Sequence, residues 1–341
     1  MTVKNHIPPD ESEFVSVIIP TRNRRELLRR TIKSLINQSY PETCFEIIVV
    51  DNSSTDGTGE MVQSLQEEAT HILRYYRKEN EGPGSSRNFG ISKARGTIVA
   101  FTDSDCVADR SWLKNGVAKM ADGVGIVQGK TLPDPDQPQR TLQQTMNIVS
   151  ENSYYQTCNI FYRKEGLESA GGFSPEFCGL NFFGKPRWGG EDTDLAWRVK
   201  KQGWKSVFTD DSVVYHHVFP VRSFREFIQS VHLTIIFTLA RIFKKHPEMR
   251  STILYRRIFK SRQRALFYLF LLSLISGMFV HWGFYLFGLP YLTRLLRVSF
   301  EGRPLKAYHR GIALLCIIFF IELIESVLSL AASLVYRTVI L

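Results

Sequence analysis

Short apolar runs rich in β-branched residues alternate with longer amphiphilic stretches along the first hundred residues. The apolar runs at residues 14–20, 45–50, 71–76 and 96–101 have the length and composition of buried strands. Helical spacing of apolar residues follows the first run, at Leu27, Leu28, Ile32, Leu35 and Ile36. Because strands that alternate with helices favour a mostly parallel sheet with covering helices, the sequence predicts an α/β fold.

The pattern is less regular between residues 112 and 220. Residues 125–129 and 155–162 are predicted as strands, and residues 213–217 as a last strand that ends in two histidines. Leu195 and Val199 follow Asp192 with helical spacing. We therefore expect Asp192 at or near a helix N-terminus.

Two carboxylates, Asp103 and Asp105, come directly after the predicted strand at 96–101. The C-terminal end of a buried strand is where an open α/β sheet places its ligand. Mg²⁺ and Mn²⁺ prefer oxygen ligands and are commonly held by one or two carboxylates, with phosphate oxygens and water completing the shell. The pair predicts a divalent cation site; the alternative is an acidic, solvated turn.

Polar groups also follow the second and third predicted strands. Residues 51–58 include Asp51 and several hydroxyls, which suit hydrogen bonds to a base or ribose or the capping of a helix. Residues 80–90 contain glycines and small hydroxyl residues, with Arg87 expected in the first turn of a helix. Backbone N–H groups at a helix start and one guanidinium favour anion binding.

Glu191 and Asp192 supply two further carboxylates, within the segment WGGED. At a helix N-terminus the dipole favours the ionised form of Asp192, and an ionised carboxylate in a glycine-lined pocket is a candidate general base. The alternative is an acidic N-cap turn without chemistry. Either His216 or His217 is a candidate to complete a metal shell, and the alternative for both is polar surface.

The composition of the chain restricts the classes of binding partner and the cellular compartment. The 341 residues carry a formal net charge of +10 and are 44% hydrophobic, which fits one α/β domain with an appendage and a polyanionic partner. Nucleic acid, anionic lipid and a phosphorylated substrate all satisfy this charge. Five scattered cysteines indicate a reducing compartment, and residues 1–13 lack a secretory pattern. We expect the front of the protein in the cytoplasm.

The character of the chain changes after residue 220. Residues 222–264 are strongly basic, and residues 227–243 are predicted as an amphipathic helix, either on an anionic membrane surface or packed on the preceding domain. Residues 266–289 contain no Asp, Glu, Lys or Arg and are long enough to span a bilayer. Residues 312–335 are also apolar but contain Glu322 and Glu325, so a buried core helix is the alternative.

Basic residues flank both apolar segments. Those before residue 266 favour the cytoplasmic side, whereas those between residues 294 and 310 would lie outside if both segments crossed the bilayer. A hairpin that enters one leaflet and returns removes this conflict. The sequence predicts membrane association and leaves the number of crossings open.

Several of these segments together resemble one enzyme family. VSVIIPTRNR, VVDNSSTDGT, GPGSSRNFGI, FTDSDC, GGFSPEF and WGGEDTDLAWR occur in the order and approximate spacing of family-2 glycosyltransferases with the GT-A fold, over residues 14–220. The WGGED segment also resembles that of β-1,4-galactosyltransferases. Arg22 stands where the family usually has an aromatic residue, and no Gln-x-x-Arg-Trp follows WGGED, so transfer of one sugar per binding event is expected.

The resemblance implies roles for individual residues. It implies that Pro20 and Thr21 contact the nucleotide, Asp51 the base and Arg87 the diphosphate. It implies a DXD pair at Asp103 and Asp105 and a metal ligand at His216. It also implies a catalytic base at Asp192 and an acceptor contact from Glu191. Asp105 is expected to coordinate Mn²⁺ or Mg²⁺ directly, with Asp103 on the ribose or on a metal-bound water.

The expected protein is an inverting, metal-dependent glycosyltransferase on the cytoplasmic face of the cell membrane. Its donor would be a nucleotide sugar, and its acceptor a hydroxyl of a lipid-linked molecule or polysaccharide. The alternatives are a polyprenyl-phosphate glycosyltransferase and an inactive membrane scaffold that binds carbohydrate; nucleic acid is not expected as a partner. The predicted parts are a tail (1–13), a GT-A catalytic domain (14–220), a basic amphipathic region (221–264) and hydrophobic membrane-associated helices (265–341).

Overall fold

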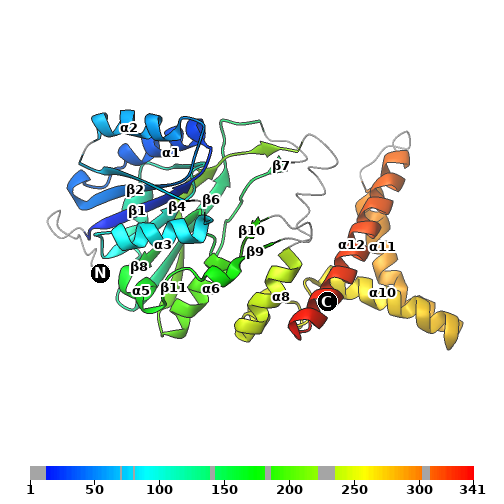
Figure 1. The fold of residues 1–341 in the computed structure, drawn as a ribbon. Helices are drawn as coiled ribbons and strands as arrows, with labels where there is room; N and C mark the ends of the chain where they lie inside the picture. The colour runs from blue at the N-terminus through cyan, green and yellow to red at the C-terminus, as the bar shows by residue number, and fades with distance from the viewer. Residues whose placement is uncertain are drawn as a thin grey trace, which may run out of the picture. The chain divides into compact units, whose positions relative to one another are not determined.

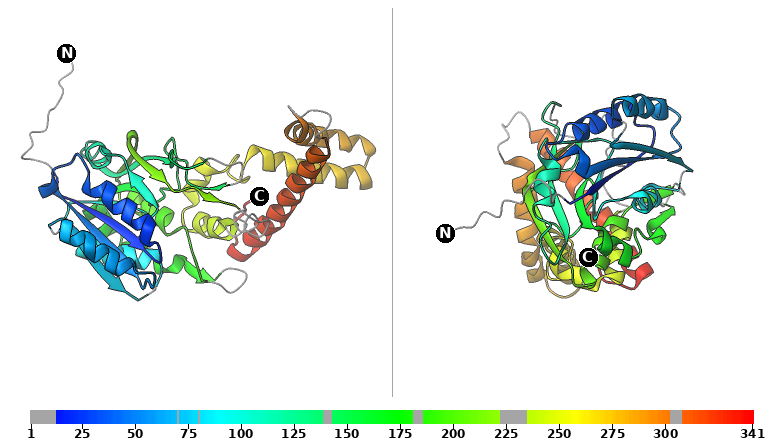
Figure 2. Two further views of the ribbon diagram at one scale, coloured as in Figure 1. Left: turned by 90° about the horizontal axis from the view of Figure 1, so that it is seen from above. Right: turned by 90° about the vertical axis from the view of Figure 1, so that its left-hand side faces the viewer.

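The computed structural model describes residues 13–69, 71–79, 81–138, 143–180, 186–221, 235–301 and 308–341. The chain forms two compact units, Met1–Ser230 and Val231–Leu341, and each has its own architecture (Figures 1 and 2). Nearly all of the predicted tail and the first half of the predicted helix at 227–243 lie outside the described residues. The predicted domain boundaries stay predictions.

The first unit is built on an eight-stranded sheet with the order β3-β2-β1-β4-β8-β6-β11-β5. Its strands are β1 (Val15–Thr21), β2 (Phe45–Asn52), β3 (Leu73–Lys78), β4 (Ile98–Thr102), β5 (Cys106–Ala108), β6 (Val124–Pro133), β8 (Asn159–Arg163) and β11 (Lys205–His216). The pairs β3-β2, β2-β1, β1-β4 and β6-β11 are parallel, whereas β8 runs antiparallel to β4 and β6, and β5 to β11. The predicted α/β fold with a mostly parallel sheet is confirmed.

Short ribbons and helices complete this unit. Two small sheets pair β7 (Gln143–Gln144) with β12 (Phe219–Pro220), and β9 (Cys178–Leu180) with β10 (Pro186–Trp188). The α-helices are α1 (Arg25–Ile36), α2 (Thr58–Glu68), α3 (Pro83–Lys93), α4 (Trp112–Val117), α5 (Lys164–Ser169) and α6 (Glu191–Lys201).

Helices cover both faces of β1 and β2, which are almost entirely buried. Val17 and Ile19 share one hydrophobic cluster with Leu28 of α1 and Val62 of α2. Ile18 points to the opposite face, because side chains alternate along a strand. There α3 approaches closely: a Cβ added at Gly90 would lie only 2.5 Å from Ile18 Cγ2. Figure 1 shows α3 apart from the α1 and α2 pair.

One predicted strand is wrong in its first half. Residues 155–162 were expected to be extended, but β8 begins at Asn159. Tyr155 has a φ of 49°, in the left-handed region that no strand adopts. Its buried ring and its hydroxyl, 3.1 Å from Glu151 Oε1, hold that turn in place.

The second unit is helical. Its elements are α8 (Ile235–Lys245), η4 (Pro247–Met249), α9 (Arg250–Ile253), α10 (Arg262–Phe279), η5 (Trp282–Gly288), α11 (Leu289–Phe300) and α12 (Tyr308–Tyr336). Phe267 and Phe270 of α10 and Tyr291 and Leu295 of α11 form its buried cluster, against which partly buried side chains of α12 pack.

Residues 266–289, which are long enough to span a bilayer, do not form one continuous helix. The α-helix ends at Phe279, and η5 doubles back along it, because Tyr285 packs on Gly277 and Gly288 on Ser273. A Cβ at Gly277 would lie 2.4 Å from Tyr285 Cε1, so this return depends on glycine. Among the described residues, one helical segment, Leu314–Tyr336 of α12, is long and apolar enough to cross a membrane.

The two glutamates of α12 have charged partners on the neighbouring helices. Glu322 Oε1 lies 3.1 Å from Arg294 Nη1 of α11, and Glu325 pairs with Arg264 of α10. Arg264 also donates to the Glu322 carbonyl, at 2.5 Å, and to Ser326 Oγ, at 3.2 Å. The carboxylates predicted to be unfavourable in lipid are therefore compensated within the unit.

Candidate active site

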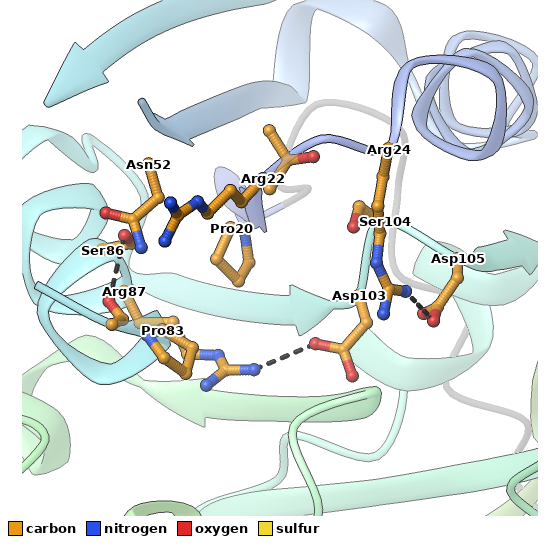
Figure 3. A pocket seen from close by; sticks show the side chains of 12 residues that line it. Pro20, Arg22, Arg24, Asn52, Pro83, Ser86, Arg87, Asp103, Ser104 and Asp105 are labelled. Carbon is orange, nitrogen blue, oxygen red and sulfur yellow. Dashed lines mark hydrogen bonds and ion pairs between the residues drawn. The ribbon is translucent and has the colours of Figure 1, made fainter. Parts of the chain in front are cut away.

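A cavity of about 310 Å³ opens where β1, β2 and β4 end and α3 begins (Figure 3). Its lining residues are Pro20, Thr21, Arg22, Arg24, Asn52, Gly82, Pro83, Ser86, Arg87, Asp103, Ser104 and Asp105. Parallel strands bring their carboxyl ends to one edge, so residues far apart in the sequence meet there. The cavity unites five residues predicted for the donor site: Pro20, Thr21, Arg87, Asp103 and Asp105.

Arg87 is held in place on one side of the cavity. Its Nη2 donates to Asp103 Oδ1 at 2.9 Å, and its Nη1 lies 3.7 Å from Glu191 Oε1. The guanidinium carbon lies 5.6 Å from the ring centre of Phe173, and the side chain is buried. Because α3 begins at Pro83, Arg87 lies in its second turn and not in the predicted first turn.

Asp105 occupies the other side of the cavity and is almost fully buried. Its Oδ2 pairs with the Arg24 guanidinium, and its Oδ1 lies 3.8 Å from His216 Nε2. His216 Nδ1 lies 2.8 Å from the His217 carbonyl oxygen, which favours a proton on Nδ1 and a free lone pair on Nε2. His217 instead places its Nδ1 against Gln137 Nε2, at 2.5 Å.

These residues fit a divalent cation. Ligand atoms of Asp105, Cys106 and His216 lie within 4.8 Å of one another. Cys106 offers a soft sulfur, which suits ions such as Zn²⁺ better than Mn²⁺ or Mg²⁺. One carboxylate and one imidazole leave positions for phosphate oxygens and water, a donor set that suits Mn²⁺ or Mg²⁺.

Asp51 is the predicted donor-site residue that does not line this cavity. Its Oδ1 accepts from the Ser54 backbone N–H at 2.9 Å, and its Oδ2 from the Tyr75 hydroxyl at 2.7 Å. The carboxylate holds the turn after β2, and its base contact stays a prediction. Thr21 differs: the residue lines the cavity, and its buried Oγ1 has no hydrogen-bond partner among the described residues.

Asp192 is the second residue of α6, as predicted, but its charge state is not what the helix dipole alone implies. Packing of protein around the carboxyl raises its pKa to about 7, and the neighbouring Glu191 charge adds to the rise. The Thr193 N–H, 2.8 Å from Asp192 Oδ1, opposes this shift but is outweighed. The predicted stabilisation of the ionised form is therefore overridden by burial.

Glu191 stands between two cavities. Its Oε1 faces Arg87, while its buried Oε2 has no partner among the described residues. A second cavity of about 140 Å³ is lined by Glu191 together with Glu81, Gly84, Ser85, Asn88, Phe173, Ser174, Pro175 and Phe177. A carboxylate residue at this wall suits a ligand hydroxyl, because an ionised carboxylate only accepts hydrogen bonds.

Sequence reasoning missed Arg24 and Cys106 beside Asp105, and Asn52 and Ser86 in the cavity wall. Arg24 lies immediately before α1, after the polar turn that ends β1. The sequence does offer a cue for Arg24. It is a basic residue close to the end of one predicted strand, and two carboxylates follow another strand of the same sheet. The nearness of Cys106 to His216 depends on the antiparallel pairing of β5 with β11.

Comparison with known proteins identifies the class. Residues 16–182 match the model of Glycosyl transferase family 2. It is 29% identical over 225 residues to Glycosyltransferase AglE of Haloferax volcanii, covering 63% of this chain and 70% of AglE. It is 38% identical over 120 residues to the GalNAc(5)-diNAcBac-PP-undecaprenol beta-1,3-glucosyltransferase of Campylobacter jejuni, covering 35% of this chain and 38% of that enzyme.

Solved structures share the fold. The mannosyltransferase PcManGT from Pyrobaculum calidifontis, in complex with GDP-Man and Mn²⁺, superposes with a TM-score of 0.56 at 19% identity, covering 96% of this chain and 87% of that one. Staphylococcus aureus TarS 1–349 with UDP-GlcNAc gives 0.51 at 20% identity, covering 88% and 79%. The predicted GT-A fold is confirmed, whereas the likeness of WGGED to β-1,4-galactosyltransferases stays a prediction.

Proposed function

We propose that this protein transfers one sugar, with inversion, from a nucleotide-diphosphate sugar to a hydroxyl of a lipid-linked or polysaccharide acceptor. The observation that carries the proposal is the cavity that brings Pro20, Thr21, Arg87, Asp103 and Asp105 together at the sheet edge. Relatives named as glycosyltransferases and neighbours crystallised with nucleotide sugars support the donor class.

The donor would lie along the cavity with its diphosphate against Arg87. This buried guanidinium, fixed by Asp103 and Phe173, opposes the charge that develops on the departing nucleoside diphosphate without having to reorganise. Thr21 Oγ1 offers an unused hydrogen-bonding group to the nucleotide. A Mn²⁺ or Mg²⁺ ion held by Asp105 and His216, with Asp103 beside it, would supply Lewis-acid stabilisation of the leaving group.

The acceptor would enter from the cavity next to Glu191. Glu191, at the wall of that cavity, would contact an acceptor hydroxyl, and Asp192, the next residue of α6, would take the proton of the attacking oxygen. A base with a pKa of about 7 is half ionised at neutral pH and still basic enough to accept that proton. Direct displacement at the anomeric carbon inverts its configuration and needs no covalent intermediate.

The helical unit supplies the proposed location. The apolar segment Leu314–Tyr336 and the exposed apolar side chains of α10 and η5 support attachment to a lipid bilayer. We place the catalytic unit on the cytoplasmic face, where nucleotide sugars are made. The lipid-linked substrate in the name of the Campylobacter jejuni relative agrees with this location.

The test is release of nucleoside diphosphate from a panel of nucleotide sugars by the detergent-purified full chain with Mn²⁺ or Mg²⁺. We expect one nucleotide sugar to release its nucleoside diphosphate, as its sugar passes to water or to an acceptor. Asp105→Ala is expected to abolish this release, while circular dichroism shows that the variant is still folded. Absence of turnover with every donor, even when membrane extract supplies acceptors, contradicts the proposal and favours the scaffold alternative. Undiminished transfer by Asp192→Asn points instead to a polyprenyl-phosphate acceptor, which needs no base.

A further inference from the structure

Two guanidinium groups face the two aspartates of the cavity, one on each side (Figure 3). Arg87 pairs with Asp103, and Arg24 pairs with Asp105. The first pair is fixed: the Arg87 side chain is 7% exposed and packs between Asp103, Glu191 and Phe173. The second pair is not equally enclosed, because the Arg24 side chain is 40% exposed while that of Asp105 is 6% exposed.

The backbone around Arg24 is anchored, so only its side chain needs to move. Arg24 precedes α1, and its carbonyl oxygen accepts the Leu28 N–H at 2.8 Å. The guanidinium carbon lies 5.6 Å from the ring centre of Phe219, and the same side chain lines the cavity. A long side chain at the cavity mouth reaches either Asp105 or a ligand in the cavity by rotating its own torsions.

Asp105 cannot serve Arg24 and a divalent cation equally well. Its carboxylate is buried and needs a cation beside it. The same carboxylate, with His216 Nε2 at 3.8 Å, forms the donor set that fits the metal ion. A guanidinium and a divalent cation on one carboxylate repel each other, whereas a guanidinium binds a phosphate group as readily as a carboxylate.

We propose that Arg24 is an exchangeable counter-cation: it neutralises Asp105 in the ligand-free enzyme and moves to the diphosphate of the nucleotide when the metal ion binds Asp105. This inference rests on the proposed function. It makes metal and nucleotide binding mutually reinforcing, since the diphosphate removes the competitor of the metal ion and the metal ion releases the guanidinium. By linkage, each ligand raises the affinity for the other by the same factor.

The test measures the two ligands separately, using the detergent-purified full chain. Mn²⁺ binding without nucleotide is followed by the electron paramagnetic resonance of free Mn²⁺, and binding of a panel of nucleoside diphosphates that includes UDP and GDP by calorimetry, with and without Mn²⁺. For Arg24→Ala we expect Mn²⁺ alone to bind about 5-fold tighter and nucleotide alone about 5-fold weaker. The factor by which Mn²⁺ raises the affinity for nucleotide is also expected to fall, because the exchange that couples the two ligands is lost.

Two variants serve as matched comparisons. Arg22→Ala removes a neighbouring cation of the same cavity, so it is expected to weaken nucleotide binding and to leave Mn²⁺ binding near that of the wild type. Arg24→Lys keeps the charge beside Asp105 and should also keep the Mn²⁺ affinity near the wild-type value. If Arg24→Ala does not fold, Arg24→Gln carries the test with the same expectation, because it keeps a polar side chain without charge.

The outcomes separate this inference from the proposed function. Unchanged or weaker Mn²⁺ binding by the uncharged Arg24 variant, in an enzyme whose wild type binds nucleotide, overturns the exchange and leaves the proposed function standing. A wild-type protein that binds no nucleoside diphosphate in the presence of Mn²⁺ overturns both. Opposite effects of the variant on the two ligands support the exchange.

Discussion

The two units of this protein distribute apolar and charged side chains in opposite ways. In the described part of the first unit, Val149 is the large apolar side chain that is exposed, and the strands bury theirs on both faces. The second unit exposes large apolar side chains along α10, η5, α11 and α12, while it buries Arg264 and Glu322 between its helices. Helices that are apolar on their exposed faces and charged on the faces that pack against each other are suited to lipid.

Buried charges therefore have different meanings in the two units. In the first unit, Arg87, Asp105 and Glu191 line cavities, whereas Asp194 is buried in an ion pair with Arg198. In the second unit Arg264, Glu322 and Glu325 also line a cavity, but their ion pairs run between helices and join α10 and α11 to α12. We assign chemistry to the cavity-lining charges of the first unit and cohesion to the ion pairs of the second, and the following experiments test this difference.

The largest effect is expected at Asp192. We predict that Asp192→Asn lowers the transfer rate by about 10²- to 10⁴-fold, because the amide cannot accept the proton of the acceptor. Nucleotide binding and the thermal midpoint are expected to stay near wild type. The measurement is nucleoside diphosphate release with membrane extract as acceptor source, alongside thermal unfolding.

Asp194, two residues further along α6, is the matched control. It is fully buried, and its Oδ2 lies 2.8 Å from Arg198 Nε, so it serves structure. Asp194→Asn is expected to lower the thermal midpoint more than Asp192→Asn does. Equal losses of stability from the two variants would argue against a chemical role for Asp192.

In the second unit, Arg264→Ala is expected to destabilise the helices by about 1.5–3 kcal/mol, because a buried guanidinium that pairs with Glu325 and donates to the Glu322 carbonyl is lost, while Lys260 stays 3.6 Å from Glu325. Thermal unfolding in detergent micelles, followed by circular dichroism, measures this loss. The double variant Arg264→Ala with Glu325→Ala should lose less, since it also removes the half-buried carboxylate that would otherwise keep only Lys260 as its cation. A double variant that is less stable than the single one would show that the pair is not what holds these helices.

The pH dependence of transfer should report Asp192. Its carboxyl has a raised pKa of about 7, so the base is ionised above this value and protonated below it. We expect kcat/KM to fall about tenfold per pH unit below pH 7 and to level off above it. A profile that stays flat from pH 5 to 8 would mean that Asp192 does not act as the base.

The smallest effect tests the lipid contact of the second unit. Trp282 begins η5 and is 70% exposed. Bromine atoms on the acyl chains of vesicles quench a tryptophan that lies in lipid. Because the chain has five tryptophans, Trp282→Phe is expected to remove about one fifth of the tryptophan emission. The emission that is lost should be chiefly the part that the brominated lipid quenches. Trp204→Phe, in the first unit, should remove unquenched emission. Equal quenching of the two tryptophans would contradict the assignment of lipid contact to the second unit alone.

Much of the first unit could be predicted from the sequence because the relevant patterns are local. The apolar runs that became β1, β2 and β4 are bounded by polar turns, and each run is short enough to be a strand. The residues at strand ends, among them Thr21 and Asp103, follow directly once the strands are known. The mistake at residues 155–158 came from Tyr155, whose φ depends on a distant packing site and not on the neighbouring sequence.

The second unit was harder to predict because composition does not reveal a reversal of the chain. Residues 266–289 look like one spanning helix, and the return at η5 depends on contacts of Gly277 and Gly288 with side chains several residues away. The pairing of Glu322 with Arg294 likewise joins residues on different helices.

The sequence by itself determined the alternation of strands and helices in the first hundred residues and the placement of carboxylates at the strand ends, because both depend on periodicity and on immediate neighbours. Only the tertiary structure decided that Arg24 pairs with Asp105, that Asp51 is engaged by Tyr75, and that Asp192 has a pKa of about 7. These properties depend on burial and on charges contributed by residues far away in the chain. Electrostatic environment is set by distance in space, which no single stretch of sequence specifies.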